Sequence, residues 1–142
     1  MTSRIIAIAN QKGGVGKTTT AINMSASLAA MEKKVLVIDC DPQANATSGL
    51  DVTPDPAKGN VYQALFDPQS MASMIHTTNL KYLHLLPSVQ DLVAAELELV
   101  EKIGREYFLR DVLAHLPAEY EYVILDCPPS LGLLTLNGLV TA

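Results

Sequence analysis

A run of glycines and lysines near the start of the chain has the composition of a phosphate-binding loop. Residues 10–20 read Asn-Gln-Lys-Gly-Gly-Val-Gly-Lys-Thr-Thr-Thr and follow the apolar segment 5–9. Glycines let the backbone turn tightly, so that successive N–H groups point at one anion, and a helix that follows adds the positive end of its dipole. We expect Lys17 to reach the β- and γ-phosphates of a nucleotide, and the Thr18 hydroxyl to bind Mg²⁺.

This loop departs from the usual pattern, G-x-x-x-x-G-K-[ST], at its first position. Gln11 stands where a glycine is expected, and Lys12 adds a second lysine at the start of the loop. The result is the deviant form of the motif. The alternative is a glycine-rich turn with incidental lysines, which the order of strand, loop, lysine, hydroxyl and helix disfavours.

Two apolar segments further along the chain end in aspartate. Residues 37–43 read Val-Ile-Asp-Cys-Asp-Pro-Gln, and residues 123–129 read Val-Ile-Leu-Asp-Cys-Pro-Pro. We favour Asp126 as the carboxylate that supports Mg²⁺, over the alternative of a residue that only caps a turn. Asp41 lies further out and is favoured as the group that positions an attacking water, whereas Asp39 is assigned to Mg²⁺-bound waters or to the loop. Spacing alone separates these last two roles only weakly.

Strands and helices are expected to alternate around these segments. Apolar runs predict strands at residues 4–9, 34–40, 80–86 and 121–127. Helical spacing predicts helices at 17–31, 60–66, 70–75, 89–103 and 105–116 and from 131 onward, with a loop over 41–56. This alternation indicates an α/β fold with a doubly wound, mainly parallel sheet covered by helices on both faces. Ligands of such sheets bind at the carboxyl ends of the strands, where the candidate residues fall.

Composition indicates a single folded domain over residues 1–142. The chain is 49% hydrophobic and 18% charged, which argues against disorder, and its apolar runs are too short to span a membrane. Two cysteines and a strand directly at the N-terminus favour the cytoplasm. The net charge is −5, with an excess of acidic residues after residue 50. No basic footprint for nucleic acid is visible, so any DNA-binding surface is expected to arise from pairing of two chains or outside this segment.

The last residues predict that the fold continues. Residues 141–142 interrupt a helical pattern without a cap or a further strand. We therefore expect an N-terminal portion of a longer fold, truncated at its C-terminus, with an open sheet edge beyond the fourth expected strand.

With these motifs in place, the chain resembles the ParA/Soj family of partition ATPases, a branch of the deviant Walker A proteins. The matching segments are residues 12–19, 39–45 and 125–130, with weaker matches at 86–88 and 95–99. The resemblance covers the whole chain and implies a P-loop NTPase fold with ATP and Mg²⁺ as cofactors. The nucleotide-binding residues that it implies are Lys12, Gly13, Gly14, Val15, Gly16, Lys17, Thr18 and Thr19.

The resemblance also implies a catalytic set and a set of partners. Lys17 acts on the triphosphate, Asp41 matches the residue that activates water, and Asp126 joins Thr18 in supporting Mg²⁺. Lys12 matches the signature lysine that crosses to the nucleotide of a partner subunit, and Gly13 lies where the two subunits approach. The family works as a Mg²⁺-dependent ATPase that forms an ATP-sandwich homodimer, binds DNA non-specifically and responds to a ParB-type partner.

The implied role is partition of a chromosome or plasmid, in the cytoplasm at the nucleoid and without membrane attachment. One alternative is a MinD-like or other positioning ATPase with a different cargo. Another is an incomplete module that binds nucleotide or pairs without catalysis.

An acidic stretch near residue 100 is expected to be a solvated helix face. It contains Glu96, Glu98 and Glu101. The alternative is a docking surface for a basic peptide of a partner.

Overall fold

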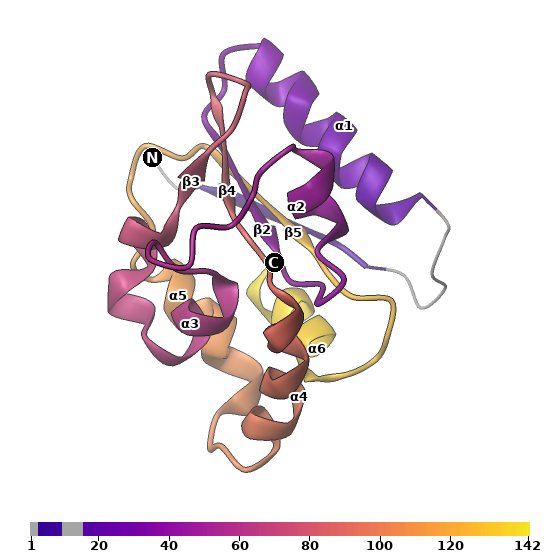
Figure 1. Cartoon of the computed structure of the whole chain (residues 1–142), viewed down its shortest axis with the longest axis vertical. Coiled ribbons are helices and arrows are strands. Elements are labelled where there is room, and N and C mark those ends of the chain that lie inside the picture. The colour runs from indigo at the N-terminus through magenta and orange to yellow at the C-terminus, as the bar shows by residue number, and fades with distance from the viewer. Residues whose placement is uncertain (1–2, 10–15) are drawn as a thin grey trace.

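The computed structural model describes residues 3–9 and 16–142, and in these residues the chain forms one five-stranded sheet covered by helices (Figure 1). The strand order is β1-β5-β2-β4-β3, with β3 antiparallel to β4 and every other pairing parallel. The strands are β1 (Arg4–Ile8), β2 (Val35–Asp39), β3 (His76–Thr77), β4 (Leu83–Leu86) and β5 (Tyr122–Asp126). The predicted doubly wound, mainly parallel sheet is therefore confirmed.

Alternating side chains of the buried strands build two separate cores. In β2, Val35 and Val37 pack with α1 (Lys17–Ala30) and α2 (Asn45–Gly49) on one face of the sheet. Leu36 and Ile38 face the other way, into the larger core. Successive strand residues point to opposite faces, so a strand that is apolar throughout requires helices on both sides.

The larger core lies under the remaining helices. These are α3 (Val61–Phe66), α4 (Val93–Val100), α5 (Phe108–Leu113) and α6 (Leu133–Thr141). Short 3₁₀ turns precede or follow them at η1 (Pro68–Met74), η2 (Gln90–Leu92) and η3 (Arg105–Tyr107). No helix among the described residues combines the length and the apolar character that crossing a membrane would require.

The position of β5 corrects one expectation. The fourth expected strand is not at an edge of the sheet, because β5 pairs with both β1 and β2. The chain skips one strand position between β1 and β2, and β5 later fills that gap. Within the described residues the edges are β1 and β3.

Two short elements lie outside the predicted ones. α2 falls within the expected loop 41–56, and β3 falls in a segment for which no strand was expected. α2 contains Asn-Ala-Thr-Ser-Gly, which has no apolar period, so local patterning could not reveal it. Its cause is a tertiary contact with the end of β2, described below.

Candidate functional site

Three strand ends and one helix start meet at a single edge of the sheet. The register places Ile8 beside Asp126, and Asp126 beside Asp39. Backbone hydrogen bonds continue the pairing by one residue: Cys40 N–H donates to Asp126 O at 2.9 Å, and Cys127 N–H donates to Ile8 O at 3.0 Å. The carboxylates that follow β2 and β5 are therefore neighbours in space.

Gly16 directly precedes α1 at this edge, as its N-cap. Its φ of 80° lies in the left-handed region, and its carbonyl accepts the first helical hydrogen bond, from Thr20 N–H at 2.8 Å. Glycine adopts this conformation without the steric cost that a Cβ imposes. Thr19 lies exposed in the first turn of α1. Lys12, Gly13, Gly14 and Val15 lie outside the described residues, so their roles stay predictions.

The side chain of Lys17 brings the candidate carboxylates together. Its Nζ forms an ion pair with Asp126 Oδ1 and lies 4.0 Å from Asp41 Oδ2. Thr18 Oγ1 donates to the other carboxylate oxygen of Asp126 at 3.1 Å. Four residues predicted from three separate motifs thus share one site.

This site combines one lysine with two carboxylates that are almost completely buried. Asp126 is fully buried, and Asp41 is 3% exposed. Burial raises the pKa of Asp126, while its contacts with Lys17 and Thr18 oppose that shift. The excess of negative charge among these three charged groups favours a further cation beside them.

The donor atoms suit Mg²⁺ when phosphate completes its shell. Mg²⁺ prefers hard oxygen ligands and usually takes only one or two from protein, with phosphates and waters as the others. The Thr18 hydroxyl and the Asp126 carboxylate supply two such oxygens side by side. Within residues 3–9 and 16–142, no cluster of three His, Cys, Asp or Glu side chains could hold a metal by itself. The residues present therefore fit a nucleotide-bound ion and not a self-contained metal centre.

Asp39 and Asp41 have different surroundings. Asp39 is fully buried and accepts hydrogen bonds from Asp41 N–H at 3.1 Å, Thr47 N–H at 2.9 Å and Thr47 Oγ1 at 2.7 Å. Asp41 turns one oxygen toward Gln43 N–H at 3.0 Å and the other toward Lys17. The carboxylate of Asp39 thus holds the loop after β2, whereas that of Asp41 faces the lysine.

Thr47 and Ser88 extend this support to β4, and neither was a predicted site residue. Thr47 Oγ1 accepts from Ser88 N–H at 3.0 Å, and Ser88 Oγ donates to Asp41 O at 2.6 Å. Both side chains are buried. A signal was present for Ser88, because segment 86–88 was among the weaker family matches, but Thr47 had none. Together they fix the backbone that carries Asp41.

We expect the substitution Thr47→Val to lower the free energy of unfolding by about 2 kcal/mol, because it removes the hydroxyl that donates to the buried Asp39 carboxylate and leaves the buried N–H of Ser88 without its acceptor. Urea unfolding measures the change. Thr47→Ser keeps the hydroxyl and should recover most of the loss. Thr53→Val, at an exposed threonine, should stay within about 0.5 kcal/mol of the wild type. Equal losses at residues 47 and 53 would contradict the network.

Asp39 should also make stability depend on pH. Burial raises the pKa of Asp39 from 3.8 to about 6, against the hydrogen bonds from Thr47 and Asp41. Between these values the folded state holds a proton that the unfolded state has lost, so protonation favours folding. This stabilisation is complete below pH 3.8 and is lost as the pH rises through about 6. The difference in free energy of unfolding between wild type and Asp39→Asn should fall by about 2 kcal/mol over that window. A difference that stays constant with pH would contradict this assignment.

The sequence interpretation placed Glu96 wrongly on a solvated helix face. Its carboxylate accepts from Leu133 N–H at 2.8 Å and Leu134 N–H at 3.1 Å, which are the first amides of α6. A Cβ on Gly132 would lie 2.7 Å from the Glu96 oxygens, so a glycine permits this approach. The expected solvated face is therefore wrong for Glu96, which caps the helix that follows the Asp126 loop.

With this geometry established, comparison with known proteins identifies the family to which the chain belongs. The family described as "AAA domain" matches residues 3–142. The chain belongs to this family. Among curated relatives, the AAA domain is 55% identical to the chromosome partitioning protein ParA of Myxococcus xanthus over 98% of the chain and 49% of that protein. It is 48% identical to the sporulation initiation inhibitor protein Soj of Bacillus subtilis, over 98% of the chain and 55% of that protein. The predicted membership of the ParA/Soj group is confirmed.

Solved structures share the fold of this AAA domain. Cobyrinic acid a,c-diamide synthase from Mycobacterium smegmatis, with bound ADP and magnesium, matches with a TM-score of 0.93 and 42% identity over 99% of the chain and 57% of that protein. A plasmid partition protein from Borrelia burgdorferi bound to AMPPNP matches with a TM-score of 0.86 and 33% identity over 100% of the chain and 60% of that protein. The chain thus spans about half the length of the curated relatives that it matches.

Proposed function

We propose that residues 1–142 are a single nucleotide-binding domain that binds Mg-ATP and acts in a ParA/Soj-type partition ATPase. The observation that carries this proposal is the meeting of Lys17, Thr18, Asp41 and Asp126 at the carboxyl ends of β2 and β5. Relatives support it, since matching solved structures hold ADP with magnesium or a nucleotide analogue.

Each described residue has a role in this proposal. Gly16 and the first turn of α1 present backbone N–H groups to the phosphates, and Lys17 exchanges its ion pair with Asp126 for contacts with the β- and γ-phosphates. Thr18 and Asp126 would hold Mg²⁺, which neutralises charge on the phosphate oxygens. Asp41, held by Ser88 and Gln43, positions the attacking water at the γ-phosphate.

The remaining parts of the proposal concern assembly. Lys12 crosses to the nucleotide of a second copy, with Gly13 at the contact, so that ATP drives formation of a sandwich homodimer. A lysine supplied by the partner makes hydrolysis conditional on pairing, because it adds charge that a loose phosphoryl-transfer transition state requires. We further propose that the dimer binds DNA non-specifically at the nucleoid and responds to a ParB-type partner during chromosome or plasmid partition.

The substitution Lys12→Ala separates pairing from nucleotide binding. With saturating Mg-ATP, light scattering after gel filtration should show a dimer for the wild type and a monomer for Lys12→Ala, while both retain nucleotide in isothermal titration calorimetry. Lys33→Ala is the matched control, because this lysine side chain is 45% exposed and lies 4.0 Å from Glu121. A dimer in Lys12→Ala would refute the crossing role. Nucleotide binding without a dimer in the wild type would favour a module that does not assemble.

A further inference from the structure

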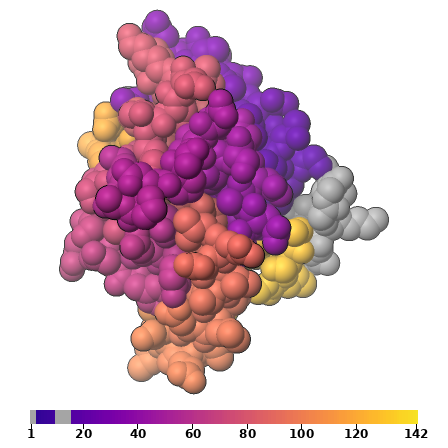
Figure 2. All heavy atoms as spheres, in the orientation of Figure 1, coloured from indigo at the N-terminus to yellow at the C-terminus, as the bar shows by residue number. Residues whose placement is uncertain are grey.

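A groove on the face covered by α3 and α4 is separate from the site described above. It encloses about 510 Å³, and none of its lining residues belongs to the nucleotide site. Its walls come from the loop at residues 56–59, from α3 and η1, and from Glu98 on α4. Figure 2 shows the segments that contain α3 and α4, in magenta and orange, side by side on one face of the molecule.

One end of the groove presents an aromatic ring to solvent. Phe66 packs edge-on against Tyr62 and against Phe108, with both centroid distances at 5.8 Å. These contacts hold the ring while 37% of Phe66 remains exposed. The face of an aromatic ring carries negative charge density, so an exposed and fixed ring attracts cations.

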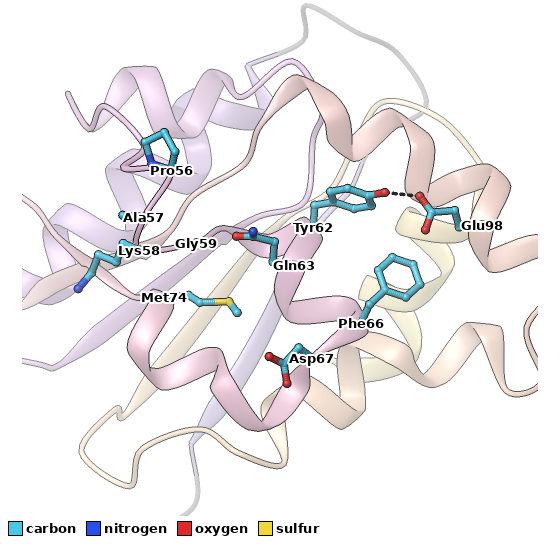
Figure 3. Close-up of a pocket in the computed structure, with 10 residues that line it drawn as sticks. All are labelled: Pro56, Ala57, Lys58, Gly59, Tyr62, Gln63, Phe66, Asp67, Met74 and Glu98. Carbon is cyan, nitrogen blue, oxygen red and sulfur yellow. Dashed lines mark hydrogen bonds between the residues drawn. The ribbon is translucent and has the colours of Figure 1, made fainter.

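The same end carries acidic groups. The Tyr62 hydroxyl donates to Glu98 Oε1, as drawn in Figure 3, and Asp67 also lines the groove. The hydrogen bond to Glu98, together with the charges of Glu98 and Asp91, raises the pKa of Tyr62. In the part of the chain that the structure describes, no lysine, arginine or histidine forms an ion pair with Glu98 or Asp67.

The basic residue of the groove lies apart from these acids. Figure 3 shows Lys58 at the opposite end, with its amine directed away from Tyr62 and Glu98. Residues 51–142 contain five Lys or Arg against twelve Asp or Glu, so this part of the chain carries an excess of negative charge. The groove therefore attracts a cationic ligand and disfavours a second copy of the same acidic surface.

We propose that this groove binds an arginine side chain within an extended basic segment of a partner protein. The guanidinium lies over the ring of Phe66 and pairs with the carboxylate of Glu98, and the rest of the segment follows the groove toward Lys58. Arginine suits this end better than lysine, because its planar group can stack on a ring and donate two parallel hydrogen bonds at once. A polypeptide is the occupant because the space exceeds that of one side chain and opens to solvent along α3. This site needs no nucleotide, so it does not depend on the proposed function.

Titration of the ¹⁵N-labelled chain with the capped peptide Gly-Ala-Arg-Ala-Gly tests the proposal. We expect amide shifts concentrated in α3 and α4, and an affinity about tenfold higher than for the same peptide with neutral citrulline in place of arginine. Equal shifts with citrulline, no shifts at all, or shifts scattered over the acidic surface would overturn it.

Two substitutions locate the binding. Glu98→Gln keeps the side-chain size and an acceptor for Tyr62. It should lower the affinity for the arginine peptide about tenfold. Phe66→Ala should lower the affinity for this peptide about threefold or more, because the aromatic ring is lost. Glu101→Gln is the matched control, because Glu101 is an exposed acid just after α4 and does not line the groove. The spectrum of each variant shows whether it is folded. A loss of peptide affinity in Glu101→Gln equal to that in Glu98→Gln would indicate non-specific electrostatic attraction and contradict the proposed site. The folded Lys17→Ala variant should bind the peptide with wild-type affinity. Peptide binding can therefore be interpreted even if Lys17 does not bind nucleotide.

Discussion

Replacing Lys17 with alanine should lower the affinity for Mg-ATP at least about 100-fold, because several charge-assisted hydrogen bonds to the phosphates are lost together. In the free protein this lysine is held by Asp126 and lies 4.0 Å from Asp41, so its amine lies beside the proposed Mg²⁺ ligand and would exchange this ion pair for the phosphates when nucleotide binds. Isothermal titration calorimetry gives the affinity directly. Thermal unfolding gives a second readout, since ligand at 100 times its Kd stabilises the wild type by about 2.7 kcal/mol.

The control for this substitution must separate binding from folding. Alanine at position 17 leaves Asp126 fully buried without its cation, so some loss of stability is expected in the absence of nucleotide. The double variant Lys17→Ala, Asp126→Asn removes the unpaired charge and should recover stability but not affinity. Lys33→Ala, at a half-exposed lysine, should change neither. Wild-type affinity in Lys17→Ala would refute the assignment of this residue to the phosphates.

Four of the five strands could be predicted from sequence because each is a local apolar run, whereas β3, with only His76 and Thr77, could not. β2 and β5 lie within the predicted ranges 34–40 and 121–127. The order of the strands in the sheet could not be predicted in the same way. Whether β5 lies beside β1 or at an edge depends on pairings across more than one hundred residues, which a local pattern does not encode.

The same distinction between local and tertiary signals applies to the residues of the candidate site. Lys17, Thr18 and Asp126 were predicted because each occupies a position of a motif with a physical reason, at the start of a helix or the end of a strand. Thr47 and Glu96 act through contacts with segments far along the chain, at Ser88 and at Leu133. Each looks like an ordinary polar residue of a loop or helix in the sequence, so only the tertiary structure reveals its partner.

The different surroundings of Asp39 and Asp41 predict that only Asp41 acts directly in ATP hydrolysis. Asp41→Asn should keep nucleotide affinity within about threefold and lower the rate of ATP hydrolysis by about 10² to 10⁴, the usual contribution of a group that positions or deprotonates water. Asparagine keeps an oxygen for Gln43 N–H, so the loop retains its hydrogen bond. Single-turnover hydrolysis, measured with excess protein at a concentration that favours pairing, isolates the chemical step from assembly. The variant should therefore accumulate in the nucleotide-bound paired form.

Two further substitutions decide whether the effect belongs to position 41. Asp51→Asn is the matched control, because Asp51 is exposed and its φ of 60° is one that asparagine tolerates well. It should hydrolyse ATP at the wild-type rate. Asp39→Asn should lower stability, because the amide nitrogen cannot accept from Asp41 N–H and Thr47 as the two carboxylate oxygens do. If Asp39→Asn instead abolished hydrolysis at unchanged stability while Asp41→Asn turned over normally, the roles of the two aspartates would be reversed.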